Sequence, residues 1–441
     1  MVALLRVGLE TVDEDDYIPQ EVLVDILTRL PIKNIVQCVC VCKSWQSLIT
    51  NPSFVTAHLN RSSSSSSSSS ADKNLVLVRT CVKEEGGAKC EEKYSLHYDD
   101  DKFGEHSILQ FTMPHICMTI IGYFNGLICL SDDYHYGYVE ELFLWNPSIR
   151  KVLPLHPLRV GFRSHGPFSH SIGFGYDPLT NDYKVVRIVH LQCDEDVPAE
   201  VDVYSLNTGK WRNISRHSGL GLQYHVEETG TQAFVNGAVH WAAFQRWSDE
   251  SPYRSLIVSF HMGDEMFRTL ELPSALSNAY LRFQVAVYRE SLSLVDNCKV
   301  DKYDIWVMEE YGRVDSWTKV ITVGVNARFD TIVALRRKGE ILMVTNWGNL
   351  VSLDPMDNSV KNLGIHTSRD SESRRLLHVD AYIESLVSLG VKCCDDVGCN
   401  GVEDHRRKRI AGKKSKKKGN NRVEWKSKAR KPGKAGGSEN E

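Results

Sequence analysis

The residues best suited to chemistry form a cluster of thiols, carboxylates and an imidazole near the end of the chain. The cluster comprises Cys393, Cys394 and Cys399, with Asp395, Asp396 and His405 nearby. These are the side chains that zinc takes as ligands in proteins. A structural zinc site, however, combines ligand pairs at fixed spacings, and no second CxxC or HxxxH pair accompanies this cluster. We therefore expect no bound metal.

No other group of residues has the spacing of a catalytic site. The sequence contains no GxSxG, no P-loop, no HExxH and no GxGxxG between a strand and a helix. Histidines such as His170 and His240 are isolated in strand-like segments, where packing is their ordinary role. We therefore expect no catalytic residue and no cofactor, and a chain that acts by binding other molecules.

The segment from Ile18 to Phe54 has the pattern of a small helical unit. Its first part repeats apolar residues at helical spacing, and Pro19 is suited to the first turn of a helix. A second apolar series begins at Ile32 and ends before Asn51 and Pro52. About 35 residues cannot bury so many large side chains by themselves, so a partner surface must cover some of them.

This segment resembles an F-box, the module that docks F-box proteins on the Skp1 adaptor of a cullin–RING ubiquitin ligase. The string PQEVLVDILTRLPIKNIVQCVCVCKSWQSLITNPSF has the Leu-Pro pair and the Cys-Lys-Ser-Trp string at the right separation. It departs from the pattern at residues 37–39, where Gln-Cys-Val replaces a usual basic–aromatic–basic trio. The resemblance implies a Skp1-binding surface of Pro19, Leu23, Ile26, Leu27, Leu30, Pro31, Ile32, Ile35, Val36, Val41, Lys43, Trp45, Leu48 and Ile49.

Downstream, short strand-like segments alternate with turns in a repeating pattern. One unit recurs at 142–155, 201–214, 257–272, 303–323 and 351–365, and a second at 122–132, 174–189, 234–244, 287–297 and 335–347. Asn-Gly, Lys-Gly and Thr-Gly pairs supply the positive φ angles of tight hairpins. Two hairpins per repeat predict four-stranded blades, and a weaker copy at 75–111 raises the number to about six. Residues 378–389 could close the ring; an open β-sandwich or two stacked sheets is the alternative.

Several strings, among them LWNPSIRKVLPL, GFGYDPLTNDYKVVRIV and VNGAVHWAA, resemble the F-box-associated interaction domain of plant F-box proteins. Many of those proteins are also called F-box/kelch-repeat proteins. The resemblance implies a non-catalytic substrate-recognition subunit of an SCF ubiquitin ligase, with Skp1, Cullin1 and a RING subunit as partners and an unknown protein as target. A non-ligase scaffold, or a propeller that binds a ligand or glycan, is the alternative.

The expected organisation has five parts. Residues 1–16 are a disordered N-terminus, 17–60 the F-box, 61–74 a serine-rich linker, 75–390 a kelch-like β-propeller and 391–441 a disordered basic tail. The linker contains nine consecutive serines and is expected to separate the two folded domains. Long insertions at 156–171, 192–200, 217–231 and 245–254 carry aromatic and arginine residues typical of interface anchors. The candidate substrate contacts are Phe162, Arg163, Tyr224, Arg246, Trp247 and Tyr253.

The two parts of the chain differ in charge. Residues 402–441 contain 15 Lys and Arg against 5 Asp and Glu, a net charge of +10, and the other 401 residues carry −13. A nuclear import signal, a nucleic-acid tether and an unselected solvated tail are the three interpretations of this tail, with nucleic acid the least favoured. Without a signal-peptide pattern or a membrane-spanning run, we expect the cytoplasm, the nucleus or both. The import candidates are Arg406, Arg407, Lys408, Arg409, Lys413, Lys414, Lys416, Lys417 and Lys418.

Overall fold

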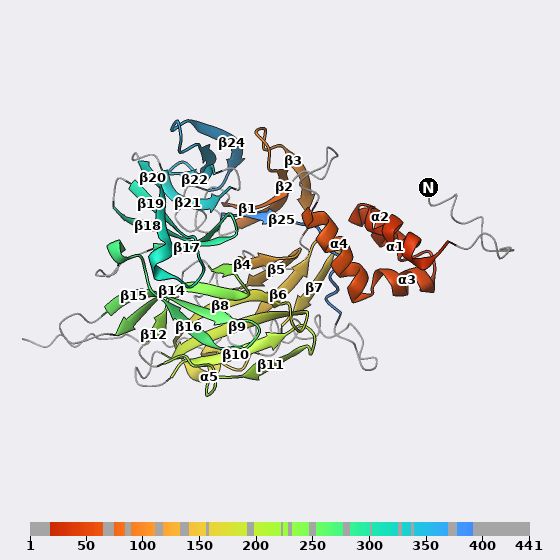
Figure 1. The fold of residues 1–441 in the computed structure, drawn as a ribbon, viewed down its shortest axis with the longest axis horizontal. Helices are drawn as coiled ribbons and strands as arrows, with labels where there is room; N and C mark the ends of the chain where they lie inside the picture. The colour runs from red at the N-terminus through yellow and green to blue at the C-terminus, as the bar shows by residue number, and fades with distance from the viewer. Residues whose placement is uncertain are drawn as a thin grey trace, which may run out of the picture. The chain divides into compact units, whose positions relative to one another are not determined.

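The computed structural model describes residues 18–64, 75–83, 90–110, 118–132, 141–155, 158–191, 198–221, 224–227, 232–246, 253–276, 283–299, 302–324, 329–336, 339–368 and 377–390. They form four N-terminal helices followed by antiparallel sheets (Figure 1). Residues 1–391 belong to one compact unit. In the described part of the chain, no helix is long and apolar enough to cross a bilayer. The predicted tail lies outside the described residues.

The helical unit contains α1 (Gln20–Thr28), α2 (Ile32–Cys38), α3 (Lys43–Ile49) and α4 (Pro52–Ser64). As predicted, Pro19 precedes the first turn of α1. The second apolar series ends with α3 at Ile49, before Asn51 and Pro52 as predicted, but the fourth helix that follows was not predicted. The Asn51 side-chain oxygen accepts the Ser53 N–H at 2.9 Å, and Pro52 begins α4. Asparagine at a cap and proline in the first turn both favour the start of a helix, and this explains the difference.

Six four-stranded blades follow, one with its first strand split in two. They contain β4–β7 (Thr119–Phe124, Leu127–Ser131, Leu142–Asn146, Lys151–Pro154), β8–β11 (Phe168–Asp177, Asp182–Leu191, Glu200–Ser205, Lys210–Asn213) and β12–β16 (Tyr224–Val226, Ala233–Val235, Ala238–Arg246, Tyr253–His261, Phe267–Leu270). The next are β17–β20 (Phe283–Tyr288, Ser291–Lys299, Lys302–Met308, Trp317–Gly324) and β21–β24 (Phe329–Leu335, Ile341–Thr345, Asn349–Leu353, Val360–His366). The sixth joins β25 (His378–Tyr382) to β1 (Leu75–Lys83), β2 (Cys90–Tyr98) and β3 (Glu105–Leu109).

Apolar clusters lie between successive blades and join each blade to the next, so that the six blades and six clusters form a closed ring. Successive side chains of a strand point to opposite faces of the sheet, and every residue of β5 and β6 is buried, so both faces of a blade contribute to these clusters. The prediction of a mostly-β, six-bladed propeller is therefore confirmed, and the sandwich alternative is excluded.

The chain closes its own ring. Strand β25 pairs with β1 through five residue pairs, from Leu75 opposite Tyr382 to Arg79 opposite His378. Residues from the two ends of the propeller sequence thus share one sheet, as expected for the segment 378–389. Closure of this kind leaves no unpaired strand between the first and the last blade.

Residues 383–389, here called the C-terminal strap, continue from β25 across the turns of the β4–β7 blade. The Asn146 side-chain amide donates to the carbonyl oxygens of Ser385 at 3.1 Å and of Val387 at 2.9 Å. At the turn between β4 and β5, Gly126 has a φ of +80°, and an added Cβ would lie 2.1 Å from the Ser385 Cβ. Glycine is required there both by its φ angle and by the close approach of the strap.

The strap and α4 also connect the F-box to the propeller. Leu386 belongs to the same buried cluster as the helical core residues Leu27 and Ile35. Leu59 of α4 belongs to the cluster between the β4–β7 and β8–β11 blades. Although the sequence predicts that the serine run separates the two domains, α4 continues to Ser64 and the domains share buried contacts. Burial of α4 offsets the weak helix propensity of its serines.

One buried histidine makes the propeller sensitive to acid. His240 is 0% exposed. Its Nδ1 donates to the Ala233 carbonyl at 3.0 Å, and its Nε2 accepts from the Tyr311 hydroxyl at 2.9 Å. Burial lowers the pKa of His240 to about 4. The unfolded chain therefore binds the additional proton between pH 6.5 and pH 4, so the stability present at neutral pH is lost as the pH falls through this window.

We expect His240 to account for a loss of up to about 3 kcal/mol of unfolding free energy as the pH falls from 7 to 4. In His240→Gln the loss should be smaller by about that amount. Urea denaturation at a series of pH values measures this, with the exposed His217→Gln as control. Identical pH slopes in the wild type and His240→Gln would contradict the assignment.

Candidate interaction surfaces

The predicted Skp1-binding residues fall into three groups according to their exposure to solvent. The exposed residues are Pro19, Ile26, Pro31 and Lys43. The half-buried residues are Leu23, Leu30, Val36, Val41, Trp45 and Leu48. The buried residues, each at most 2% exposed, are Leu27, Ile32, Ile35 and Ile49. The buried four form the core of the unit and cannot contact a partner in this conformation, so any role they have in docking is to hold the exposed residues in place.

An apolar stripe lies on the exposed side of α1 and of the residues before it. Ile18, Val22 and Ile26 are 50%, 48% and 46% exposed and lie at i, i+4 and i+8, on one face of the helix. Ile26 is among the predicted contacts, whereas Ile18 and Val22 are not. Their helical spacing was visible, but only the structure shows that Leu23 and Leu27 turn inward while these three face outward.

The long connections of the propeller gather at one end of its sheets. In each blade the strands alternate in direction, so the connections after the second strand and between blades lie at the same end. We call this end the loop face. All four predicted insertions, at 156–171, 192–200, 217–231 and 245–254, begin or end there. The tight turns after the first and third strands lie at the opposite end.

The structure brings three of the six candidate substrate contacts together. Tyr224 of β12 is half-buried and lies opposite Gln245 of β14, and the next residue, Arg246, lies opposite Tyr253 of β15. These three therefore lie at the loop end of one sheet. Phe162 and Arg163 lie in the short helix α5 (Phe162–His165) between β7 and β8, and Trp247 lies outside the described residues. The nuclear-import candidates also lie outside them, and their role stays a prediction.

One exposed aromatic residue of the loop face was missed. Trp347 is 58% exposed in the turn between β22 and β23, next to Gly348 with a φ of +80°. The Asn-Trp-Gly sequence shows a turn, but it does not show that the turn lies at the same end as the long insertions. Exposed tryptophan is enriched among residues that dominate binding energy.

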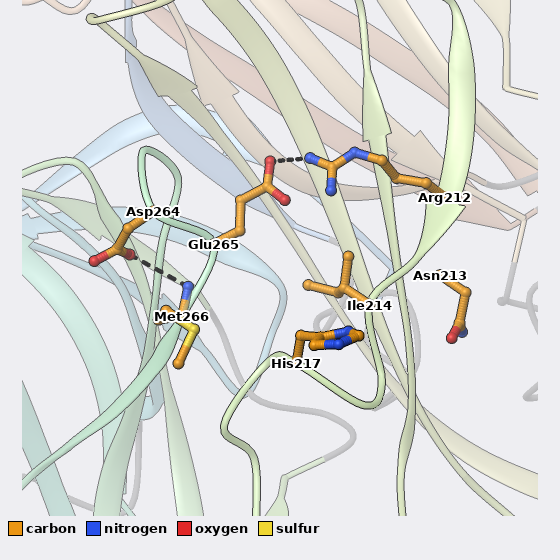
Figure 2. Close-up of a pocket in the computed structure, with 7 residues that line it drawn as sticks. All are labelled: Arg212, Asn213, Ile214, His217, Asp264, Glu265 and Met266. Carbon is orange, nitrogen blue, oxygen red and sulfur yellow. Dashed lines mark hydrogen bonds and ion pairs between the residues drawn. The ribbon is translucent and has the colours of Figure 1, made fainter.

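A pocket of about 370 Å³ lies where β11 meets the turn between β15 and β16 (Figure 2). It is lined by Arg212, Asn213, Ile214, His217, Asp264, Glu265 and Met266. Figure 2 shows the Arg212 guanidinium directed at Glu265, with which it pairs, and the Asp264 carboxylate directed at the Met266 N–H. Each of these charged groups thus already has a partner within the protein.

A buried ion network behind this pocket joins two blades. Lys184 lies 3.0 Å from Asp177 and 3.0 Å from Glu265, and it donates to the Met262 carbonyl at 2.6 Å. Burial alone would raise the pKa of Asp177, but hydrogen bonds from Thr180 and Lys184 outweigh this and lower it. The pocket is therefore part of a contact between blades rather than a separate ligand site. Among the described residues, no group of three or more His, Cys, Asp or Glu could hold a metal ion.

A small helical unit with an exposed apolar stripe, joined to a propeller with long connections at one end, defines a two-part binding protein. Residues 16–60 match the F-box-like family model, and residues 80–385 match the model of the F-box associated beta propeller domain. The chain therefore belongs to the family of F-box proteins that carry an F-box associated β-propeller.

Its relatives include three proteins of Arabidopsis thaliana. The F-box protein CPR1 is 30% identical over 85% of this chain and 89% of its own length. An F-box/kelch-repeat protein is 29% identical over 69% of this chain and 79% of its own length. A further F-box protein is 26% identical over 79% of this chain and 88% of its own length. These matches support a substrate-receptor role in general.

Proposed function

We propose that the chain is the substrate-recognition subunit of an SCF ubiquitin ligase. The observation that carries the proposal is the combination of an F-box with a solvent-exposed apolar stripe and a propeller held to it by shared buried residues. The stripe of Ile18, Val22 and Ile26 docks on a Skp1-like adaptor, which brings Cullin1 and the RING subunit. The chain itself acts as an adaptor and supplies proximity, while the ubiquitin chemistry belongs to its partners.

The loop face is the proposed site for the target protein. Aromatic and arginine residues dominate the energy of protein interfaces, and Tyr224, Arg246, Tyr253 and Trp347 all lie at this end of the sheets. Because the F-box and propeller share buried contacts, the target is held in a defined orientation to the adaptor rather than on a flexible tether.

The proposal is tested by purifying the tagged full-length chain from plant cells and identifying Skp1-like proteins and Cullin1 among its partners. Both should be present. Skp1 without Cullin1 would favour a non-ligase scaffold, and the absence of both would contradict the proposal. A bound small ligand or glycan that co-purifies with the chain in the absence of Cullin1 would favour a ligand-binding propeller.

A further inference from the structure

Three arginines are buried in the described part of the chain, and one of them lacks a carboxylate. Arg79 pairs with Glu92, and Arg336 pairs with Asp99 and Glu340. Arg187, which is 0% exposed, forms no ion pair with any described residue. Burying a guanidinium without a counter-charge is costly, and the other two buried arginines avoid this cost. The exception therefore needs an explanation.

The free groups of Arg187 share one edge of the guanidinium. Its Nη1 donates to the Val160 carbonyl at 2.8 Å. The guanidinium carbon, Cζ, lies 5.4 Å from the centre of the Phe168 ring. The Nε and Nη2 atoms have no hydrogen-bond partner. Together, Nε and Nη2 form the fork that binds the two oxygens of a carboxylate or phosphate side by side.

The neighbouring carboxylates make no hydrogen bond to this edge. Asp202 lies opposite Arg187 in the pairing of β9 with β10. Its Oδ1, however, accepts from Arg159 Nε at 3.3 Å and from Asn213 Nδ2 at 2.9 Å. Burial lowers the pKa of Arg187 to about 10; the charges of Asp202 and Asp132 oppose this effect, and the charge of Arg159 adds to it. No described carboxylate therefore pairs directly with the Arg187 guanidinium.

We propose that Arg187 is the anchor of an oxyanion site that binds one phosphate or carboxylate group through the Nε–Nη2 edge. The site lies in the interface between the β4–β7 and β8–β11 blades. Residues alternate along β9, and Val185, two positions away on the same face, belongs to the cluster between these blades.

The residues that cover Arg187 belong to a connection between two blades, which lies at the loop face. Val160 and Phe168, which contact Arg187, begin and end the segment that contains α5, with Phe162 and Arg163. An anion enters when this segment shifts, or it is enclosed as the chain folds. The position of α5 would therefore depend on whether an anion is bound to Arg187. The site does not depend on Skp1 docking, so its test is independent of the proposed ligase role.

The test measures the thermal midpoint of the purified full-length chain in phosphate, acetate or chloride at equal ionic strength. We expect phosphate or acetate to raise the midpoint by about 3 °C over chloride, and the more effective of the two identifies the group preferred. The increase should be lost in Arg187→Met and retained in the exposed Arg216→Met. A phosphate assay on the denatured chain, purified without phosphate, detects an anion enclosed during folding.

A second variant keeps the test decisive if Arg187→Met does not fold. Arg187→Lys keeps the charge but loses the two-donor edge, so its affinity for the oxyanion should fall at least tenfold. The proposal is overturned if neither anion stabilises the wild type and no phosphate co-purifies, which would leave Arg187 solvated by internal water only. It is equally overturned if both Arg187 variants respond to the anions as the wild type does.

Discussion

Ending the chain at Leu377 should prevent the propeller from closing. This truncation removes β25 and the C-terminal strap, with the buried side chains Val379, Tyr382, Leu386, Val387 and Leu389. At 1.5–3 kcal/mol for each large apolar side chain, the loss is on the order of 10 kcal/mol. That is comparable to the entire net stability of a typical domain. We expect aggregation or proteolysis of the truncated chain, measured by size-exclusion chromatography and limited trypsin digestion.

The matched control ends at Val391 and keeps both β25 and the strap. It should retain the thermal midpoint of the full chain, because all residues of the described core precede Val391. It also lacks the basic clusters at 406–409 and 413–418, so unchanged nuclear entry would count against an import signal there. A folded, protease-resistant chain ending at Leu377 would show that ring closure is not needed for stability.

A third truncation after Tyr382 separates the two contributions. It keeps the pairing of β25 with β1 and removes only the strap. We infer that its propeller closes, while the contact of Leu386 with the helical core is lost. The stepwise loss of stability from Val391 to Tyr382 to Leu377 would thus distinguish the strap from the closing strand.

The repeat of the propeller could be predicted from sequence because its signals are local. Asn125 and Gly126 both have positive φ, as do Asn236 and Gly237, and such pairs define a hairpin without reference to the rest of the fold. The pattern of two hairpins per repeat then gives the number of strands in a blade. The closing segment could be anticipated for a similar reason, since a single unpaired strand remained after the last repeat.

The surfaces were harder to predict because exposure depends on what packs against each residue. Leu27 and Ile26 are neighbours in sequence and alike in character, yet one is 1% and the other 46% exposed. Leu386 joins the F-box core from more than 300 residues away, and no local pattern shows this contact. In the sequence Arg187 is an ordinary charged residue within an apolar strand, and only the three-dimensional structure shows that its Nε and Nη2 have no hydrogen-bond partner.

The exposed stripe permits a sharper test of docking than truncation of core residues. In Val22→Glu with Ile26→Lys, two exposed apolar side chains become an i, i+4 ion pair, which supports rather than disrupts α1. Loss of two central apolar contacts should cost on the order of 4 kcal/mol of binding free energy, about a thousandfold in Kd for the Skp1-like adaptor. Biolayer interferometry with the purified adaptor measures this directly.

Two further variants separate docking from folding. Leu27→Ala creates a cavity in the F-box core and should cost about 2–5 kcal/mol of stability, so its loss of binding would accompany unfolding of the helices. Val320→Glu replaces an apolar residue of β20 that is 42% exposed, and it should leave adaptor binding unchanged. If the double variant keeps its helical circular dichroism and still binds the adaptor as the wild type does, docking uses another face of the F-box. If binding is lost with the helices intact, the docking energy is assigned to the surface of α1 and not to the core beneath it.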